Sequence, residues 1–218
     1  MAELLVHRRQ RAELIRVAID LVRNSLNDDS GNLSCRVSDG FLVTPSAISV
    51  DKLQPADIVY VGFDGRFVGK RKPSSEWPFH LAIYLDRPEV NAIAHCHSLF
   101  AEVLSMIHQP IWVKYPYTVM SMGGDVRCVV PFELPGGEAL ARRLVLGLRN
   151  RHACLIASHG QVTLGATLQI AAKRAKFVER AALRQALAFM VGKPVSISPK
   201  LVRALRPLFQ HYGQGNEK

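Results

Sequence analysis

Hydrophobic and polar positions along the chain follow two periods, and these periods predict a mixture of helices and strands. From Leu14 to Leu26 the apolar residues recur every three or four positions, which predicts an amphipathic helix over about residues 2–26. Short apolar runs then flank Ser38-Asp39-Gly40 and Asp64-Gly65, and each arrangement is typical of a β-hairpin. The first third of the chain is therefore expected to hold one helix followed by two hairpins.

Later in the chain, strands and helices are expected to alternate. The apolar runs that predict strands cover residues 92–97, 126–131, 153–158 and 162–164. The helical patterns cover residues 75–85, 100–108, 137–148, 167–190 and 199–211. This order suits an α/β protein with a central, mostly antiparallel sheet and helices packed on its faces. No shift of composition, repeat or low-complexity stretch divides the 218 residues, so one domain over residues 1–218 is expected.

Composition and charge narrow the expected location and partners. The start of the chain lacks the apolar core of a signal peptide, and no apolar run approaches the roughly 20 residues that cross a bilayer. A cytoplasmic protein without a membrane partner is therefore expected. The formal net charge of +10 could attract nucleic acid, an anionic membrane or phosphorylated metabolites. The basic residues are scattered and form no aromatic-interleaved motif, so no nucleic-acid partner is expected.

The four cysteines form no CxxC pair and lie in apolar, strand-like runs, which predicts buried free thiols rather than disulfides. They are Cys35, Cys96, Cys128 and Cys154.

His95 and His97 lie two positions apart in a predicted strand. Because side chains alternate between the faces of a strand, both imidazoles are expected on one face, and Cys96 on the other, in the core. His159 follows another predicted strand and precedes Gly160. Three neutral imidazoles with an open fourth position are a common arrangement for catalytic zinc, where a substrate oxygen can bind and be polarised. The spacing alone also suits histidines that only form hydrogen bonds, so both interpretations stay open at this point.

The other histidines are expected on helix surfaces or loops and are given no role. They are His7, His80, His108, His152 and His211.

A carboxylate and three polar stretches indicate a site for an anion. Pro73-Ser74-Ser75-Glu76-Trp77 places two hydroxyls and an acid at the expected start of a helix. These groups could simply cap the helix and complement its dipole. The same features can bind phosphate, and a carboxylate beside a metal can act as a general base. Ser30-Gly31-Asn32-Leu33-Ser34 and Thr44-Pro45-Ser46-Ala47 are also polar and adjoin strands, although either could be only a turn. Three such stretches favour an anion site more than any one of them does.

Taken in order, five short motifs resemble those of the class II aldolase/adducin family. They are Gly31-Asn32-Leu33-Ser34, Thr44-Pro45-Ser46, Pro73-Ser74-Ser75-Glu76-Trp77, His95-Cys96-His97-Ser98 and His159-Gly160. Their order and spacing match from about residue 8 to residue 213, and the set is far more specific than any one motif. Within the family, the Pro-Ser-Ser-Glu-Trp run and the Tyr212-Gly213 ending are most similar to the L-fuculose-phosphate aldolase branch.

The resemblance implies a three-layer α/β/α sandwich and a homotetramer with active sites at the subunit interfaces. It implies one Zn2+ per subunit on three histidines, with a glutamate beside the metal as the acid/base. The implied ligands are His95, His97 and His159, and the implied acid/base is Glu76. The resemblance also implies a substrate-phosphate site, formed by Gly31, Asn32, Ser46, Ala47, Ser74 and Ser75.

Two tyrosines complete the implied catalytic set. Tyr117 matches the family's proton-donating tyrosine, with Tyr115 as a neighbouring alternative. Tyr212 matches a C-terminal tyrosine that reaches the site of a neighbouring subunit. The implied reaction is the reversible cleavage of a ketose 1-phosphate, such as L-fuculose 1-phosphate, into dihydroxyacetone phosphate and an aldehyde.

Other activities share the same motifs. A metal-dependent decarboxylase of a sugar-acid phosphate or an aromatic acid is one alternative, and a dehydratase of a thioribulose phosphate is another. A non-enzymatic, adducin-like binding module is a third, but such modules commonly lack the ligands that this chain retains. The chain departs from the aldolase branch at Ala47, where the branch has glycine, at Ser158, where it has histidine, and over residues 130–137. These departures bear on the substrate more than on the metal.

Overall fold

The structure is a computed structural model that describes residues 6–27, 30–112, 121–195, 197–198, 200–201 and 204. The strands are β1 (Asn32–Val37), β2 (Gly40–Val43), β3 (Val59–Gly62), β4 (Phe67–Val68), β5 (Ala92–Cys96), β6 (Arg127–Val129), β7 (Ala153–Ile156) and β8 (Gly160–Gly165). The α-helices are α1 (Arg8–Arg23), α2 (Trp77–Asp86), α3 (Leu99–Met106), α5 (Glu138–Gly147) and α6 (Leu168–Val191). Two 3-10 helices, η2 (Val50–Lys52) and η3 (Pro55–Asp57), lie between β2 and β3.

Within these described residues the strands form one eight-stranded sheet in the order β4-β3-β2-β1-β5-β8-β7-β6. Both predicted hairpins are present, as β1–β2 and β3–β4. All neighbouring pairs are antiparallel except β6 and β7, which run parallel. The prediction of a mostly antiparallel sheet is therefore confirmed. Strand β5 lies between β1 and β8, near the centre of the sheet.

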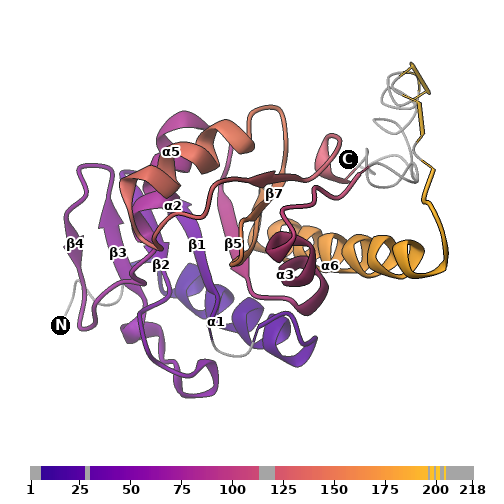
Figure 1. Ribbon diagram of the computed structural model, residues 1–218. Helices are drawn as coiled ribbons and strands as arrows, with labels where there is room; N and C mark the ends of the chain where they lie inside the picture. Colours follow the sequence, from indigo (N-terminus) through magenta and orange to yellow (C-terminus); the bar gives the residue numbers. More distant parts are fainter. Residues whose placement is uncertain are drawn as a thin grey trace, which may run out of the picture.

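Helices cover both faces of the sheet, as Figure 1 shows. Helices α2 and α5 pack on one face, where Phe79, Ile83 and Leu144 join a core with residues of β2, β3, β5, β7 and β8. Helices α1 and α6 pack on the other face, against alternate residues of β1 and β5. The predicted three-layer α/β/α arrangement is confirmed.

Most predicted elements are present, with shifted ends. Helix α2 begins at Trp77 rather than at Ser75, so the serine pair and Glu76 lie in the turn before it. The two 3-10 helices were not predicted, because three-residue elements have no periodicity to detect. The helix predicted over 199–211 falls almost wholly outside the described residues. Among the helices that are described, none is long and apolar enough to cross a membrane.

The four cysteines are free thiols, as predicted. Three are buried, and only Cys128 is partly exposed. Burial raises the pKa of these thiols, to about 12 for Cys35 and Cys96.

Candidate metal centre and adjoining cavity

His95 and His97 lie at the end of β5 and direct their rings to the same place. The side chain of His95 is fully buried on the α2 side of the sheet, and its ring and that of Phe79 are nearly perpendicular, at a centroid distance of 5.7 Å. Cys96, between the two histidines, is buried in the opposite core with α1 and α6. The centroids of the two imidazoles are 4.7 Å apart. The alternation expected from the sequence is thus observed.

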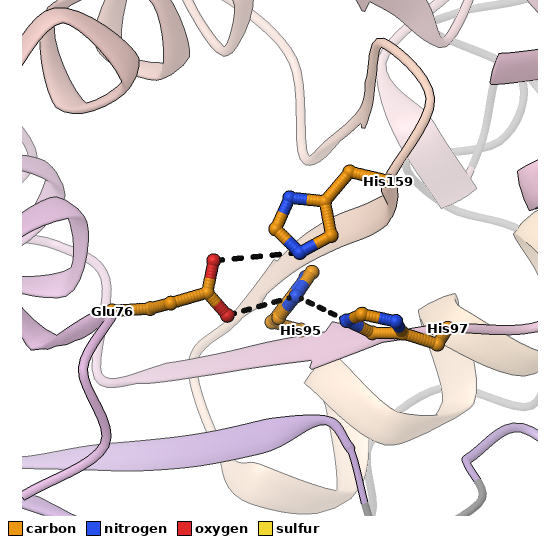
Figure 2. Close-up of side chains that lie close together, drawn as sticks. All are labelled: Glu76, His95, His97 and His159. Atoms are coloured by element: carbon orange, nitrogen blue, oxygen red, sulfur yellow. Dashed lines mark hydrogen bonds and ion pairs between the residues drawn. The ribbon is translucent and has the colours of Figure 1, made fainter. Parts of the chain in front are cut away.

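His159 comes to the same place from the turn between β7 and β8. Its ring centroid is 4.8 Å from that of His95 and 4.9 Å from that of His97. The turn is tight, and Ser158 adopts a left-handed backbone conformation with φ of +52°. Figure 2 shows the three rings converging, with His95 and His97 coming from one strand and His159 from a neighbouring turn. The pairing of β5 with β8 brings together histidines that are more than sixty positions apart in the sequence.

Glu76 completes the cluster as its only carboxylate among the described residues. It is the N-cap residue of α2, yet its side chain makes no capping hydrogen bond. Instead the carboxylate turns toward the histidines, as Figure 2 shows, with Oε2 3.1 Å from His95 Nε2 and Oε1 3.6 Å from His159 Nε2. This geometry does not agree with the alternative prediction that Glu76 only caps helix α2 or complements its dipole.

The protonation states of Glu76 and His159 suit a cation. Burial alone would raise the pKa of the Glu76 carboxyl, but His95, His159 and the amide of Asn32 lower it to about 2. Burial and the neighbouring His95 lower the pKa of His159 to about 4. At neutral pH the first group is therefore an anion and the second a neutral imidazole. These are the forms in which carboxylate and histidine bind metals.

Several features show that the four side chains fit a metal ion. One ligand atom from each lies within 4.8 Å of all the others. The Nε2 atoms of His95 and His97 are 2.9 Å apart, and tetrahedral zinc holds neighbouring ligand atoms roughly 3.4 Å apart. Glu76 Oε1 and His159 Nδ1 are buried and have no hydrogen-bond partner among the described residues. A buried anion without a full set of partners is costly, and a cation held by the neighbouring histidines would compensate the charge of the carboxylate.

The neighbours of the histidines fix the orientation of the rings. His95 Nδ1 is 2.9 Å from the carbonyl oxygen of Gln161, to which it donates, so Nε2 is the ring nitrogen that faces the cluster. His97 Nδ1 lies 3.4 Å from a carboxylate oxygen of Glu102. The backbone N–H of His97 donates to the side-chain oxygen of Asn27 at 3.0 Å. Such outer partners orient metal-binding histidines and raise their basicity.

A cavity of about 200 Å3 adjoins the cluster at Glu76. Every residue implied for the substrate phosphate lines this cavity, as do Asn27, Ser30 and Thr44. The loops are tied together by backbone hydrogen bonds from Ser46 to the carbonyl of Lys72 and from Ser74 to the carbonyl of Thr44. The three polar stretches, distant in the sequence, thus form one wall beside the candidate metal centre.

Two positions in this wall depend on backbone conformation and close approach. Ala47 has φ of +55°, so the chain keeps there a left-handed conformation that glycine adopts without strain. At Gly31 a Cβ atom would meet the side chain of Asn27 and would lie 2.5 Å from the carbonyl oxygen of His95. Glycine at position 31 therefore permits the contact between the polar loop and the metal-binding strand.

The expectation that His80 lies at a surface without a role is wrong. Its side chain is fully buried, and its ring stacks on Phe79 at a centroid distance of 4.5 Å. Burial lowers the pKa of His80 to about 3, so the ring is neutral. The four-residue spacing from Glu76 to His80, one helical turn, was the signal that could have revealed it.

Asn32 lines the cavity, but its side-chain amide is already hydrogen-bonded to Glu76 and His80. The two catalytic tyrosines implied by the resemblance, Tyr117 and Tyr212, lie outside the described residues, as does Tyr115.

Comparisons with known proteins agree with this geometry. The model of the class II aldolase and adducin N-terminal domain matches residues 12–186. A 5-methylthioribulose-1-phosphate/5-deoxyribulose-1-phosphate aldolase from Rhodospirillum rubrum is 35% identical over 93% of this chain and 92% of its own length. A 3-oxo-tetronate 4-phosphate decarboxylase from Escherichia coli (strain K12) is 34% identical over 84% of this chain and 87% of its own. The solved structure of an L-fuculose 1-phosphate aldolase superimposes with a TM-score of 0.88 at 31% identity, over 92% of this chain and 95% of the other.

Proposed function

This chain belongs to the class II aldolase and adducin family, whose aldolases are metal-dependent lyases. From that premise we propose that it reversibly cleaves a ketose 1-phosphate into dihydroxyacetone phosphate and an aldehyde. The observation that carries the proposal is the position of the cluster. Three histidines converge on Glu76, which lines a cavity, and the polar loops that line the same cavity carry the motifs that resemble the family's phosphate site. A metal site and an anion site therefore adjoin at one carboxylate.

Metal binding is proposed for His95, His97 and His159, with Zn2+ as the ion. When bound, the ion would supply a Lewis acid for the negative charge that develops on the substrate oxygens. The three rings lie beside Glu76, which lines the cavity. Imidazole ligands suit zinc, and the same set also accepts other first-row divalent metals.

Glu76 is the proposed acid/base. In the cleavage direction the C3–C4 bond breaks, its electron pair stays on the dihydroxyacetone phosphate half, the C4 hydroxyl loses a proton and C3 gains one. In the direction of synthesis, Glu76 removes that proton from C3, for which its ionised carboxylate is prepared. Tyr117 is proposed to give the balancing proton to the aldehyde oxygen.

The substrate phosphate is proposed to bind in the cavity. Ser46, Ser74 and Ser75 would donate hydroxyl groups, and Ser75 is exposed to the cavity just before the N-terminus of α2. Asn32, Ala47 and the close backbone at Gly31 would complete this wall. Binding the remote phosphate orients the reacting carbons beside Glu76. A homotetramer, with Tyr212 reaching a neighbouring site, extends the proposal on the strength of the family resemblance.

The test is release of dihydroxyacetone phosphate from a panel of ketose 1-phosphates, with and without a chelator. The panel includes L-fuculose 1-phosphate, 5-deoxyribulose 1-phosphate and 5-methylthioribulose 1-phosphate. Chelator-sensitive release is expected from at least one sugar, and restoring Zn2+ should restore it. Glu76→Gln should keep the metal but lower kcat by about 10²–10⁴-fold, the usual contribution of a general acid/base. Glu138→Gln is the matched control, since that glutamate is 89% exposed on α5, where it pairs only with Arg142 among the described residues.

One relative favours a second candidate. The similarity to the 3-oxo-tetronate 4-phosphate decarboxylase makes metal-dependent decarboxylation of a sugar-acid phosphate the alternative reaction. Protein with one metal ion per subunit that releases no dihydroxyacetone phosphate, but releases CO2 from such an acid, would replace the aldolase assignment.

A further inference from the structure

A continuous chain of buried hydrogen bonds leads from Tyr84, near the C-terminal end of α2, to Glu76. Tyr84 Oη lies 2.8 Å from Ser34 Oγ, which lies 2.7 Å from His80 Nδ1. On the other side of the ring, His80 Nε2 lies 2.6 Å from Asn32 Oδ1. Asn32 Nδ2 then donates to Glu76 Oε2 at 2.9 Å. None of these five side chains is more than 7% exposed.

The chain has one direction, because only one assignment of hydrogens satisfies it. The carboxylate accepts, so Asn32 must face it with the amide nitrogen and must face His80 with the amide oxygen. That oxygen can only accept, so His80 carries its hydrogen on Nε2. The neutral ring then accepts at Nδ1 from Ser34, which accepts in turn from Tyr84. Each group thus donates toward Glu76.

The elements that carry these residues explain the alignment. Glu76, His80 and Tyr84 are spaced by four residues along one side of α2. Asn32 and Ser34 are spaced by two along β1 and so face the same side of the sheet. Asn32 pairs across the sheet with His95. The chain therefore connects the interior of the helix with the candidate metal centre.

We propose that His80 is a positioning residue for Glu76, acting through Asn32 to hold carboxylate oxygen Oε2 and leave Oε1 as the oxygen that exchanges protons with substrate. Oε1 is buried and has no hydrogen-bond partner among the described residues, whereas Oε2 is held by Asn32. In the direction of synthesis the C3–H bond breaks, its electron pair stays on the substrate carbon, and the new O–H bond forms at Oε1. This role rests on the proposed aldolase function.

The proposed role differs from simple core packing. The His80 ring stacks with Phe79 and also lies parallel to Phe41, at centroid distances of 4.5 and 6.4 Å. Phenylalanine at position 80 would preserve much of this packing but would remove both hydrogen bonds. Glutamine would lose the stacking but keep an N–H that can donate to Asn32. The two variants therefore separate packing from hydrogen bonding.

The kinetic test compares His80→Phe and His80→Gln with the wild type on the sugar phosphate that it cleaves. His80→Phe should keep its metal, show little change in KM and lose about 10–100-fold in kcat, as outer-shell substitutions do. His80→Gln should recover most of that loss. His152→Phe, the same exchange at a histidine remote from the chain of hydrogen bonds, is the control. Turnover of His80→Phe equal to that of the control would overturn the proposal, as would a His80→Gln variant no faster than His80→Phe.

A second measurement does not depend on turnover. Nitrogen-15 NMR of the wild-type protein with labelled histidine should show His80 as the Nε2–H tautomer, identified by the signal that His80→Gln lacks. An Nδ1–H tautomer would overturn the directional chain even in an active aldolase. Absence of turnover on the whole sugar panel, with the Nε2–H tautomer present, would instead remove the aldolase function and leave the positioning of Glu76 standing.

Discussion

Replacing Gly31 by alanine should reveal how closely the polar loop and the metal-binding strand are joined. The position is not in a left-handed conformation, so an alanine backbone fits. The added Cβ, however, would lie 2.5 Å from the carbonyl oxygen of His95 and would meet the side chain of Asn27. Asn27 could rotate away, but the His95 carbonyl belongs to the central strand and can yield only if the loop moves.

The magnitude follows from three contributions. Overpacking at a close backbone contact costs about 1–3 kcal/mol. Rotation of Asn27 would release its hydrogen bond from the backbone N–H of His97, worth about 1 kcal/mol. Alanine restricts the unfolded chain and returns about 0.4–1 kcal/mol. Gly31→Ala should therefore lower the free energy of unfolding by roughly 1–3 kcal/mol and also weaken metal binding, since both displaced contacts belong to the histidine strand.

Urea denaturation of the metal-free protein measures the first effect without the contribution of bound metal. The control is Gly192→Ala, because a Cβ there meets nothing within 4 Å and the backbone is extended, with φ of 166°. The control should match the wild type or exceed it slightly. A Gly31→Ala variant with the same urea midpoint as the control would refute the argument that this glycine is required by packing. Titration with zinc at equal protein concentration then measures the loss of metal affinity.

Two further substitutions test other parts of the site. Ala47→Gly should raise the free energy of unfolding by about 1 kcal/mol in urea denaturation. Alanine in the left-handed region costs about 1–2 kcal/mol, and glycine offsets part of that gain because it has more conformational entropy to lose on folding. A less stable variant would contradict this prediction. The folded-state pKa of His80, about 3, lies below its ordinary 6.5, so below pH 6.5 only the unfolded state takes up a proton there and stability falls. Between pH 7 and 5 the wild type should lose roughly 2 kcal/mol more than His80→Gln, and parallel losses would contradict it.

The periodicity of apolar residues predicted most elements of the fold and part of the candidate site. The alternation around His95 and His97 predicted that both rings share a face and that Cys96 enters the opposite core, because strand geometry leaves no other choice. His159 could be suggested as a third ligand from the sequence, but only the resemblance favoured it over a histidine that merely forms hydrogen bonds, since strand order cannot be read from one sequence. The contacts that bring it there are the pairings of β5 with β8 and of β8 with β7.

The burial and the hydrogen-bond partners of His80 were not predicted from the sequence. Taken alone, a histidine inside a helical pattern is compatible with a surface position, and the apolar residues around it do not identify its partners. Those partners, Asn32 and Ser34, belong to a strand more than forty positions earlier. Only the packing of α2 on β1 reveals that a polar stripe on the helix faces a polar pair on the strand.

This polar contact also explains how the fold fixes the carboxylate. A helix turns about 100° per residue, so sliding α2 by one position would rotate Glu76, His80 and Tyr84 away from β1 together. Each would then leave a buried donor or acceptor unpaired, at a cost of about 1–3 kcal/mol per group. An apolar interface of the same area would penalise such a slip less, because hydrophobic contact is not directional. The hydrogen bonds therefore select one register between helix and sheet, and that register places the Glu76 carboxylate against His95.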